Sequence, residues 1–396
     1  MKNVLIVEPE PTGHHLVLYV YLVIKAVLRA GYNPILMISE RSKNSSEYEL
    51  LIKCVGRNID VVYLRDHRNN SEKNLSIFMY QVRLLIEIRT AFARLKRKTD
   101  VFFVFMTNID HIDKVLSISI NPFKGVPLSG IVMNPKFHRY EMNVGDRSRN
   151  DSVFRLLFML LVKKKWIHYL CLTDEVFVQY MHRFNKFKSK LIYLPEPGEV
   201  KAQISKPNAK NKLGIDEYKF VVLVYGYISK RKGLQFLLNA IRDASDKFCV
   251  CVAGELSEYA KKLLDCDYAH DMVKKGCLVI KPGFKSVDEQ ANLFSAADVV
   301  WVAYVDNYHG SSGVFFQAAS LGLPVIVSDR GLLKWMCDKY KNGIACNPEI
   351  PSDILDVITA LGCDANLYSV LSENSRRLGK SHTYEEFIKK IISLLR

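Results

Sequence analysis

DVVWVAYVDNYHGSSGVFFQAASLGLPVIVSD, residues 298–329, is the stretch that decides the fold. An apolar run of strand length ends near Tyr304, a glycine-serine loop follows, a helical pattern passes through Gln317, and a second apolar run occupies 324–328. Strand, loop, helix and strand in this order indicate parallel strands joined by a helix. Glycine lets the loop backbone approach a ligand closely, and a helix start offers free N–H groups and a positive dipole end. The stretch therefore predicts an anion site at Gly310, Ser311, Ser312 and Gly313, with Ser311 or Ser312 as the N-cap; a plain capped turn is the alternative.

Alternating strands and helices fill the chain before this stretch. Apolar runs predict strands at 4–7, 33–38, 59–64, 101–105, 128–133 and 169–172, and helical patterns occupy 15–30, 46–56, 76–97 and 152–165. The alternation breaks at Leu194-Pro195-Glu196-Pro197-Gly198 and the polar stretch 201–212. Two prolines and a glycine continue neither element, so this segment is predicted to be an interdomain linker.

The alternation then restarts. Strands are expected at 220–225, 248–253, 277–280, 299–304 and 324–328, and helices at 234–244, 258–264, 287–296, 314–321, 351–361 and 384–395. Strands alternating with helices mean a parallel sheet covered on both faces. The sequence thus predicts an α/β protein with two tandem Rossmann-like, doubly wound lobes at 1–197 and 198–375, an interlobe cleft, and a C-terminal helical segment at 376–396.

Charge and hydropathy restrict the partners and the compartment. No apolar run approaches the roughly 20 residues of a membrane span, and the first run is too short for a signal peptide, so we expect a cytoplasmic chain. The net charge of +15 favours anionic partners such as nucleotide sugars, anionic lipids or nucleic acid. The basic residues cluster on one predicted helix and in the segment after another: Arg83, Arg89, Arg94, Lys96, Arg97, Lys98 and Lys163-Lys164-Lys165-Trp166. Peripheral association with an anionic inner membrane surface and a merely solvated helix face both remain open.

A second turn at the same predicted sheet edge carries three cations. Tyr225-Gly226-Tyr227-Ile228-Ser229-Lys230-Arg231-Lys232-Gly233 ends the first strand of the second lobe and enters a helix. Arginine can bind phosphate oxygens in a bidentate manner, and lysine adds a point charge. Gly226, Arg231 and Lys232 are therefore predicted to bind a phosphate together with the glycine-serine loop, although solvated lysines are the alternative.

A histidine pair follows the first strand of the first lobe. Gly13-His14-His15 lies at the carboxyl edge of that strand, where a histidine is suited to position a hydroxyl or a reacting phosphate. We expect His14 and His15 to be catalytic, with a packing or capping histidine as the alternative.

The order of the motifs resembles glycosyltransferase family 4, which has the GT-B fold. The motifs are GYISKRKG, then Gly254-Glu255, then KPGF, then LFSAADVVWVAY, then GSSGVFFQAASLGLPVIVSD, and they cover about residues 220–330. The resemblance extends more loosely to the GHH turn and to the LTDE and LPEPG segments. It implies a hexosyltransferase-like enzyme with the acceptor on the N-terminal lobe and the nucleotide-sugar donor on the C-terminal lobe. No further cofactor and no metal are expected.

Several family positions are occupied by other residues here. The resemblance implies an arginine directly after Gly226, where this chain has Tyr227. It also implies a lysine before the next glycine, which is retained here as Lys232 with Arg231 beside it. The family's two glutamates fall on His309 and Gln317. His309 is expected to be catalytic beside the donor sugar, where it can donate or accept a hydrogen bond. The Gln317 amide oxygen can still accept a hydrogen bond from the ribose.

These features predict sugar transfer to an acceptor hydroxyl on a glycan or a lipid-linked acceptor, in glycan, polysaccharide or glycolipid biosynthesis. The resemblance implies retention of the anomeric configuration, but the substitutions leave the outcome open. A non-catalytic scaffold with the same two lobes is the alternative that the lost glutamates favour. Nucleic-acid recognition is not expected, because the basic clusters lack interleaved aromatic residues for base stacking. Asp265-Cys266-Asp267 matches a metal-binding Asp-x-Asp pattern, but it trails a predicted helix and so predicts no metal site.

Overall fold

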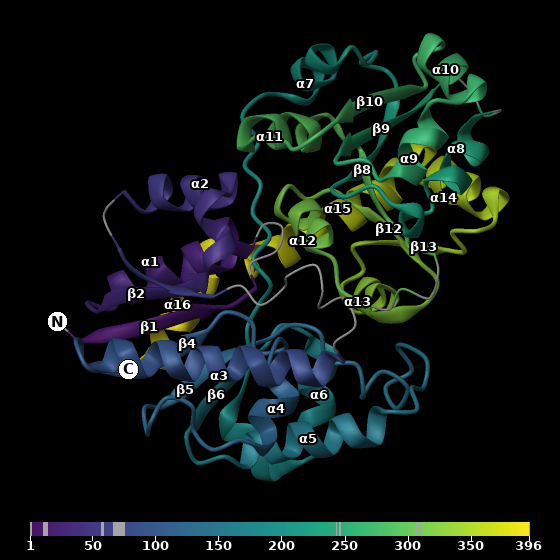
Figure 1. The fold of residues 1–396 in the computed structure, drawn as a ribbon. Coiled ribbons are helices and arrows are strands. Elements are labelled where there is room, and N and C mark those ends of the chain that lie inside the picture. The colour runs from purple at the N-terminus through teal and green to yellow at the C-terminus, as the bar shows by residue number, and fades with distance from the viewer. Residues whose placement is uncertain are drawn as a thin grey trace. The chain divides into compact units, whose positions relative to one another are not determined.

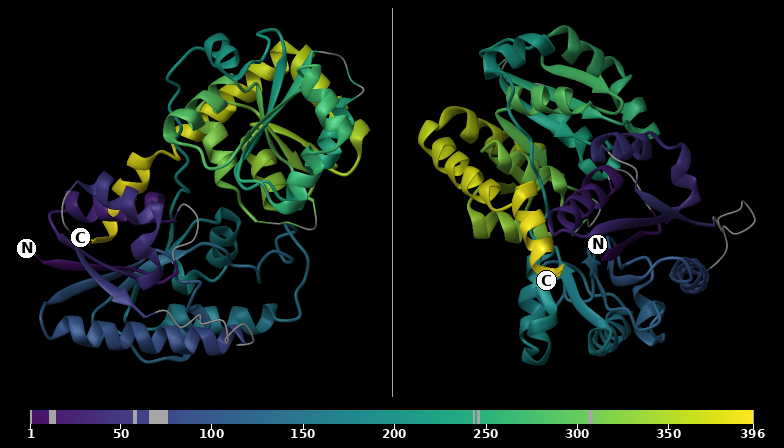
Figure 2. Two further views of the ribbon diagram at one scale, coloured as in Figure 1. Left: turned by 45° about the horizontal axis from the view of Figure 1, so that its top comes forward. Right: turned by 90° about the vertical axis from the view of Figure 1, so that its left-hand side faces the viewer.

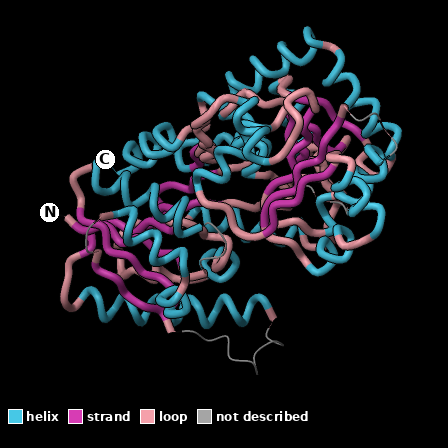
Figure 3. The backbone as a smooth tube through the Cα atoms, turned by 90° about the horizontal axis from the view of Figure 1, so that it is seen from above, coloured by secondary structure: helices cyan, strands magenta, loops and turns pink. Residues whose placement is uncertain are grey.

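The computed structural model describes residues 2–10, 15–56, 59–65, 76–242, 244, 247–305, 308 and 310–395. The chain divides into two compact units, which we call the first lobe (1–142, 146–195 and 385–396) and the second lobe (143–145 and 196–384). In each lobe, helices pack on both faces of one parallel sheet (Figures 1 and 3). The prediction of two doubly wound α/β lobes is confirmed.

The first-lobe sheet has seven parallel strands in the order β3-β2-β1-β4-β5-β6-β7. Its strands are β1 (Asn3–Glu8), β2 (Asn33–Ser39), β3 (Asp60–Leu64), β4 (Val101–Met106), β5 (Leu128–Val132), β6 (Ile167–Leu172) and β7 (Leu191–Tyr193). The central strands are buried on both faces, which is why they read as continuous apolar runs in the sequence. The strand order runs from β1 to β2 and β3 on one side and from β4 to β7 on the other. The carboxyl ends of the neighbouring strands β1 and β4 therefore lie side by side where the strand order reverses.

Helices cover both faces of this sheet. One face holds α3 (Ile77–Lys96), α4 (Asp113–Ile118), α5 (Asp151–Lys163) and α6 (Glu175–His182), whose apolar side chains share one core with the strands. The remaining helical segments are η2 (Leu16–Val20), α1 (Tyr21–Arg29), η3 (Glu40–Asn44), α2 (Ser46–Val55), η5 (Asn185–Lys190) and α16 (Tyr384–Leu395). The last of these, α16, returns to this lobe beside the N-terminal helices (Figure 2).

The second-lobe sheet has six parallel strands in the order β10-β9-β8-β11-β12-β13. Its strands are β8 (Phe220–Tyr225), β9 (Phe248–Gly254), β10 (Leu278–Pro282), β11 (Val299–Val302), β12 (Val325–Ser328) and β13 (Gly343–Cys346). β8 pairs with β11, so the turn that follows β8 and the loop that follows β11 lie at the same sheet edge. Both predicted anion-binding turns therefore come from neighbouring strands.

The second-lobe helices also lie on both faces. α8 (Leu234–Arg242), α9 (Glu258–Leu264), α10 (Asp267–Lys274) and α14 (Pro351–Cys363) share a core with one face of the strands. The other helices are α7 (Lys206–Leu213), η6 (Lys230–Lys232), α11 (Val287–Ala296), α12 (Gly313–Ser320), α13 (Gly331–Tyr340) and α15 (Ala365–Lys380). α7 packs on α11, and α15 packs on α12.

The linker segment is one place where the structure differs from the sequence-based expectation. The polar stretch 201–212, expected to be linker, contains α7, which begins with Pro207 in its first turn and ends at Gly214 in a left-handed conformation with φ of 74°. Its Lys210 is buried, and its ammonium group donates to the carbonyls of Glu217 and Lys219. It also pairs with Asp298 at 3.2 Å, so a lysine that reads as solvated in the sequence is buried with partners in the structure.

The C-terminal segment is the other difference. The expected boundary at 376 falls inside α15, and only α16 joins the first lobe. There the Phe387 ring packs against Tyr19 at 6.0 Å, and Arg29 pairs with Glu385 at 2.6 Å. Within the described residues no single helix is long and apolar enough to cross a bilayer; Pro351–Cys363 and Ala365–Leu395 reach that length only together, across a bend of 93°.

Candidate active site

The structure brings the two predicted anion-binding turns of the second lobe together. Gly226 follows β8 with φ of 99°, and a Cβ on it would lie 3.9 Å from Val314 in the first turn of α12. A Cβ on Gly254, at the end of β9, would lie only 2.0 Å from the Gly226 carbonyl oxygen. Glycine is therefore required at Gly254 for the backbones to approach this closely. The result is a backbone-lined turn directly beside the start of α12.

Lys232 lies buried behind this turn, 3% exposed. Its ammonium group donates to the Tyr225 carbonyl oxygen at 2.7 Å and lies 5.3 Å from the centre of the Tyr304 ring. Burial, together with the neighbouring Arg231, lowers the pKa of Lys232 to about 7. A lysine with few compensating contacts and a lowered pKa is suited to bind an anion, because an arriving negative charge restores its protonated form.

The backbone around Lys232 is anchored to β11 and to the loop that follows it. The Trp301 indole donates to the Lys232 carbonyl at 2.7 Å, and the Val305 amide donates to the Arg231 carbonyl at 2.9 Å. Gly233 continues the turn in a left-handed conformation with φ of 62°. These contacts hold the cations of η6 at the sheet edge.

Arg231 is exposed, and its guanidinium group stacks on two tyrosine rings. It lies 4.3 Å from the centre of the Tyr308 ring and 5.4 Å from that of Tyr304. Within the described part of the chain its N–H groups make no hydrogen bond. Stacking fixes the plane of the guanidinium while leaving its donors available, an arrangement suited to bidentate phosphate binding.

The start of α12 differs in one respect from the expectation. Ser312 occupies the N-cap position, but its side chain makes no capping hydrogen bond and instead contacts the Tyr304 hydroxyl at 2.9 Å. The Ser311 hydroxyl does not cap either, because it donates to Glu196 at 3.2 Å. The prediction of Ser312 as the N-cap residue is confirmed, although its side chain makes no capping hydrogen bond. The backbone amides of Gly313 and Val314 make no hydrogen bond among the described residues, so these two donors remain available to a ligand.

Glu196 is the residue of this site that sequence reasoning missed. It is 9% exposed, one of its oxygens accepts from Ser311, and the other lies 3.6 Å from the position of a Cβ on Gly313. Gly198 makes this placement possible, since a Cβ there would lie 2.4 Å from that of Phe316. A glutamate between two prolines in LPEPG was the available signal, but only the tertiary approach of this segment to α12 shows its place.

Gln317, His309 and Gly310 complete the account of the second-lobe predictions. The Gln317 amide oxygen is buried and accepts no hydrogen bond among the described residues. An unsatisfied buried acceptor is costly, so a ligand hydroxyl that reached it would be favourable. His309 lies outside the described residues. Gly310 is described, and a Cβ on it would lie 2.7 Å from the Tyr308 hydroxyl.

In the first lobe a buried carboxylate orients His15. Glu8 ends β1 with no exposed surface, accepts from the Thr107 hydroxyl at 2.7 Å, and lies 3.4 Å from Nδ1 of His15. His111, after β4, lies 3.9 Å from the other Glu8 oxygen. A carboxylate beside Nδ1 selects the tautomer of the imidazole and can stabilise its protonated form. Sequence reasoning missed Glu8 and His111, although a glutamate that ends a buried strand was a visible signal; His14 lies outside the described residues.

Solved structures with the same fold define the class. Sucrose-phosphate synthase from Thermosynechococcus elongatus superimposes with a TM-score of 0.70 at 14% identity, covering 100% of this chain and 98% of that one. HepE from Anabaena, solved in complex with UDP and glucose, gives a TM-score of 0.67 at 13% identity, covering 100% and 99%. These likenesses show the fold: the chain is a two-lobed protein of the GT-B class.

One known family matches part of the chain. Residues 205–378 match the family described as glycosyl transferases group 1. An uncharacterized glycosyltransferase from Methanocaldococcus jannaschii is 24% identical over 216 residues. That alignment covers 52% of this chain and 53% of the relative, so the chain spans about half the length of the curated relative it matches. The matched segment contains the turn after β8 and all of α12, so Tyr227 and Gln317 both lie within it.

Proposed function

We propose that this protein transfers a sugar from a nucleotide-sugar donor to an acceptor hydroxyl, and that the donor diphosphate binds between η6 and the start of α12. The convergence of Lys232, Arg231 and the open amides of Gly313 and Val314 at one sheet edge carries this proposal. Two cations and two N–H donors match the charge and the oxygen atoms of a diphosphate.

In the proposed reaction the bond between the anomeric carbon and the diphosphate oxygen breaks. A bond forms from that carbon to the acceptor oxygen, the hydroxyl proton is lost, and the nucleoside diphosphate leaves with an additional negative charge. The two cations and the α12 amides would stabilise that charge electrostatically, so we propose that transfer is metal-independent. The Glu196 carboxylate, placed by Ser311 beside the anion site, is suited to accept a hydrogen bond from a donor sugar hydroxyl.

The first lobe would supply the acceptor side. Glu8 orients His15 at the carboxyl edge of the sheet, and an oriented imidazole can hold the acceptor hydroxyl or take up its proton. We propose a glycan or a lipid-linked acceptor and a role in glycan, polysaccharide or glycolipid biosynthesis. HepE with bound UDP and glucose supports the choice of a nucleotide-sugar donor.

The decisive experiment incubates the purified chain with a panel of nucleotide sugars and follows release of the nucleoside diphosphate, with and without candidate acceptors. Release from one donor, together with binding of the matching nucleoside diphosphate, would support the proposal. If no donor is turned over and no nucleotide binds, the alternative of a non-catalytic GT-B scaffold, which the substitution at Gln317 favours, replaces it.

We further propose a cytoplasmic location with peripheral binding at an anionic membrane surface. α5 exposes an apolar stripe, Val153, Leu156 and Leu160, that leads to the exposed Lys163 and Lys165. Apolar side chains beside lysines suit the interface of an anionic bilayer. Co-sedimentation with phosphatidylserine vesicles should decrease in a Leu156→Glu, Leu160→Glu variant. Equal sedimentation of the variant and the wild type would contradict this use of α5.

A further inference from the structure

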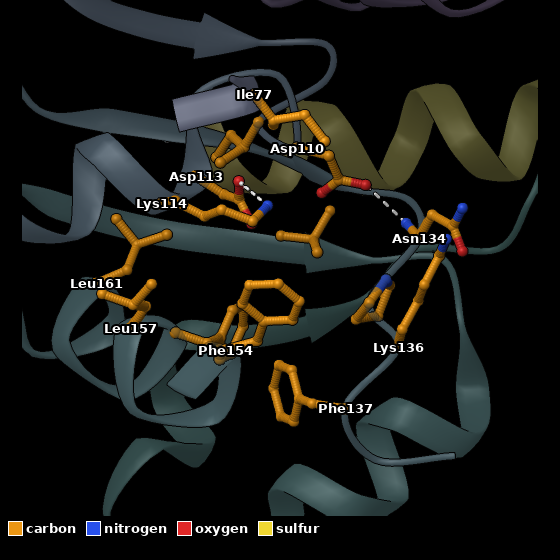
Figure 4. A pocket seen from close by; sticks show the side chains of 14 residues that line it. Ile77, Asp110, Asp113, Lys114, Asn134, Lys136, Phe137, Phe154, Leu157 and Leu161 are labelled. Atoms are coloured by element: carbon orange, nitrogen blue, oxygen red, sulfur yellow. Dashed lines mark hydrogen bonds and ion pairs between the residues drawn. The ribbon is translucent and has the colours of Figure 1, made fainter. Parts of the chain in front are cut away.

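A pocket of about 260 Å³ opens in the first lobe at the carboxyl ends of β4 and β5 (Figure 4). Its polar side comes from the segments that follow these strands and from the start of α4, where Asp110, Asp113 and Lys114 lie. Its opposite side is formed by α5 and by Phe137. All of these elements belong to the first lobe. The pocket therefore lies at the same sheet edge as the cluster of Glu8 and His15, outside the proposed donor site.

The walls are mainly apolar. Nine of the fourteen lining residues have hydrocarbon or aromatic side chains: Ile77, Ile109, Val132, Pro135, Phe137, Phe154, Leu157, Phe158 and Leu161. Such a lining favours a hydrocarbon or aromatic group over a freely hydrated one. The buried members of this group, such as Leu161 and Ile109, belong to the core and give the pocket a fixed floor.

The charged side chains that line the pocket differ in how many of their polar atoms form hydrogen bonds or ion pairs. Lys114 pairs with Asp113 at 3.1 Å, and Asp113 also accepts from Gln81 at 3.1 Å. Asp110 uses a single oxygen, Oδ2, to accept from the amides of Met133 at 3.2 Å and Asn134 at 2.7 Å. The second of these contacts is visible in Figure 4. The other oxygen, Oδ1, makes no hydrogen bond within the described residues.

The environment of Asp110 makes this open oxygen a functional candidate. Burial and the nearby Asp113 raise its pKa to about 7, while the two amides and Lys114 oppose the rise. Lys136 also lines the pocket and is exposed. A carboxyl group of this kind, open toward an apolar pocket, binds a hydroxyl strongly because little water competes for it.

We propose that this pocket binds the acceptor as a hydroxylated amphiphile. Its hydroxyl donates to Oδ1 of Asp110, and its hydrocarbon part lies against Phe154, Leu157 and the floor of the pocket. The assignment of this pocket as the acceptor site rests on the proposed function. It narrows the proposed acceptor from any glycan or lipid-linked molecule to one that presents a hydroxyl next to an apolar group. Asp110 immediately precedes His111, which contacts Glu8, so the bound hydroxyl would lie beside the cluster that orients His15.

The first experiment fills the pocket. Binding of 2-octanol to the full chain is measured by calorimetry or saturation-transfer NMR, without vesicles. Leu157→Trp places an indole in the pocket and should weaken binding by about tenfold or more, because the hydrocarbon loses its buried site. Ser152→Trp adds the same side chain at an exposed position of the same helix and should leave binding unchanged. Equal loss in both variants, or no saturable binding to the wild type, overturns the proposal.

The second experiment tests the hydrogen bond to Asp110 by comparing a ligand that can donate a hydrogen bond with one that cannot. At pH 8.5 the Asp110 carboxylate can only accept, so the wild type should prefer 2-octanol, which donates, to 2-octanone, which does not, by about tenfold. In Asp110→Asn the amide oxygen can keep the contacts with Met133 and Asn134, and its NH₂ group then faces the pocket. The preference should disappear or reverse. An unchanged preference in Asp110→Asn shows that the hydroxyl binds elsewhere and overturns the assignment.

These measurements do not require a donor. If 2-octanol binds as expected but no nucleotide sugar is turned over, the proposed function fails and the binding site stands. If transfer occurs and Leu157→Trp leaves the KM for the acceptor unchanged, the transferase stands and the pocket is not its acceptor site. Binding of the nucleoside diphosphate should be the same in Leu157→Trp and the wild type, because no residue of the second lobe is altered.

Discussion

The carboxyl edges of the two sheets carry opposite chemistry. In the second lobe, the edge presents Lys232 and Arg231 together with unbonded helix amides. In the first lobe, the corresponding edge presents two carboxyl groups, the buried Glu8 and the partly exposed Asp110, with His15 beside Glu8. The same strand order around a central strand has thus produced one edge for an anion and one edge for a hydroxyl. Fold alone does not assign these roles, because each depends on which side chains follow the strands.

The largest expected effect is on the cationic edge. Lys232→Ala should lower kcat/KM for transfer by about a hundredfold to a thousandfold, the range typical of losing one preorganised group that stabilises transition-state charge. Lys232→Met keeps most of the buried volume and should show a similar loss, which separates charge from packing. Lys230→Ala removes an exposed cation from the same turn and should have little effect. Transfer at the wild-type rate in Lys232→Met would remove the phosphate assignment.

The next effect tests the carboxylate edge. Glu8→Gln should lower kcat by about tenfold to a hundredfold, part of the roughly 10²–10⁴ that a positioned acid-base group contributes. The KM for the donor should not change, because Glu8 belongs to the first lobe and lies outside the proposed donor site. Thr107→Val removes another Glu8 contact but keeps the His15 contact, so its effect should be smaller. A rise in the donor KM without a change in kcat would show a structural role for Glu8.

A smaller effect concerns the pH dependence of donor binding. Lys232 has a pKa lowered to about 7, so it is charged below pH 7 and increasingly neutral above it. Affinity for the nucleoside diphosphate released in the donor panel should therefore fall, by up to about tenfold, as the pH rises from 6 to 8. The ligand's own terminal phosphate gains charge over the same range and acts in the opposite direction. Lys232→Met should retain only that ligand contribution.

Comparing the pH dependence of nucleoside diphosphate affinity in Lys232→Met and in the wild type isolates the contribution of Lys232. If calorimetry gives the same pH dependence for Lys232→Met and the wild type, the buried ammonium group does not contact the diphosphate. A matched measurement with Lys230→Ala should reproduce the wild-type curve, since that side chain is exposed.

The sequence predicted the residues of the cationic sheet edge better than those of the carboxylate sheet edge. The cationic edge could be located because its parts are local: glycines and serines between an apolar strand and a helix, and three cations directly after another strand. Glu196 could not, because its position depends on the close approach of Gly198 to Phe316, a contact between segments more than a hundred residues apart in the sequence. The carboxylate edge was harder to locate, since Glu8 and His111 meet only when β1 and β4 pair.

The same reasoning applies to the fold. Long apolar runs predicted the central strands, whereas β7 and β13, with three and four residues, were missed because short runs carry little periodicity. α7 was missed because its Lys210 reads as solvated, although it is buried and paired in the structure. Local patterns thus predicted the lobes, and tertiary pairing brought together the polar residues of the proposed sites.

The smallest expected effect is at Gln317, where the resemblance to glycosyltransferase family 4 implies a glutamate that contacts the ribose. The Gln317 amide oxygen is buried and has no hydrogen bond among the described residues. Gln317→Glu should tighten binding of the nucleoside diphosphate by a few-fold, since a charged acceptor makes the stronger hydrogen bond. The gain should disappear with the 2′,3′-dideoxy analogue, and a gain of equal size with both ligands would show that residue 317 does not contact the ribose. The free protein should become less stable, because the new carboxylate is buried there without a partner; glutamine would then be the more stable but more weakly binding choice at this position.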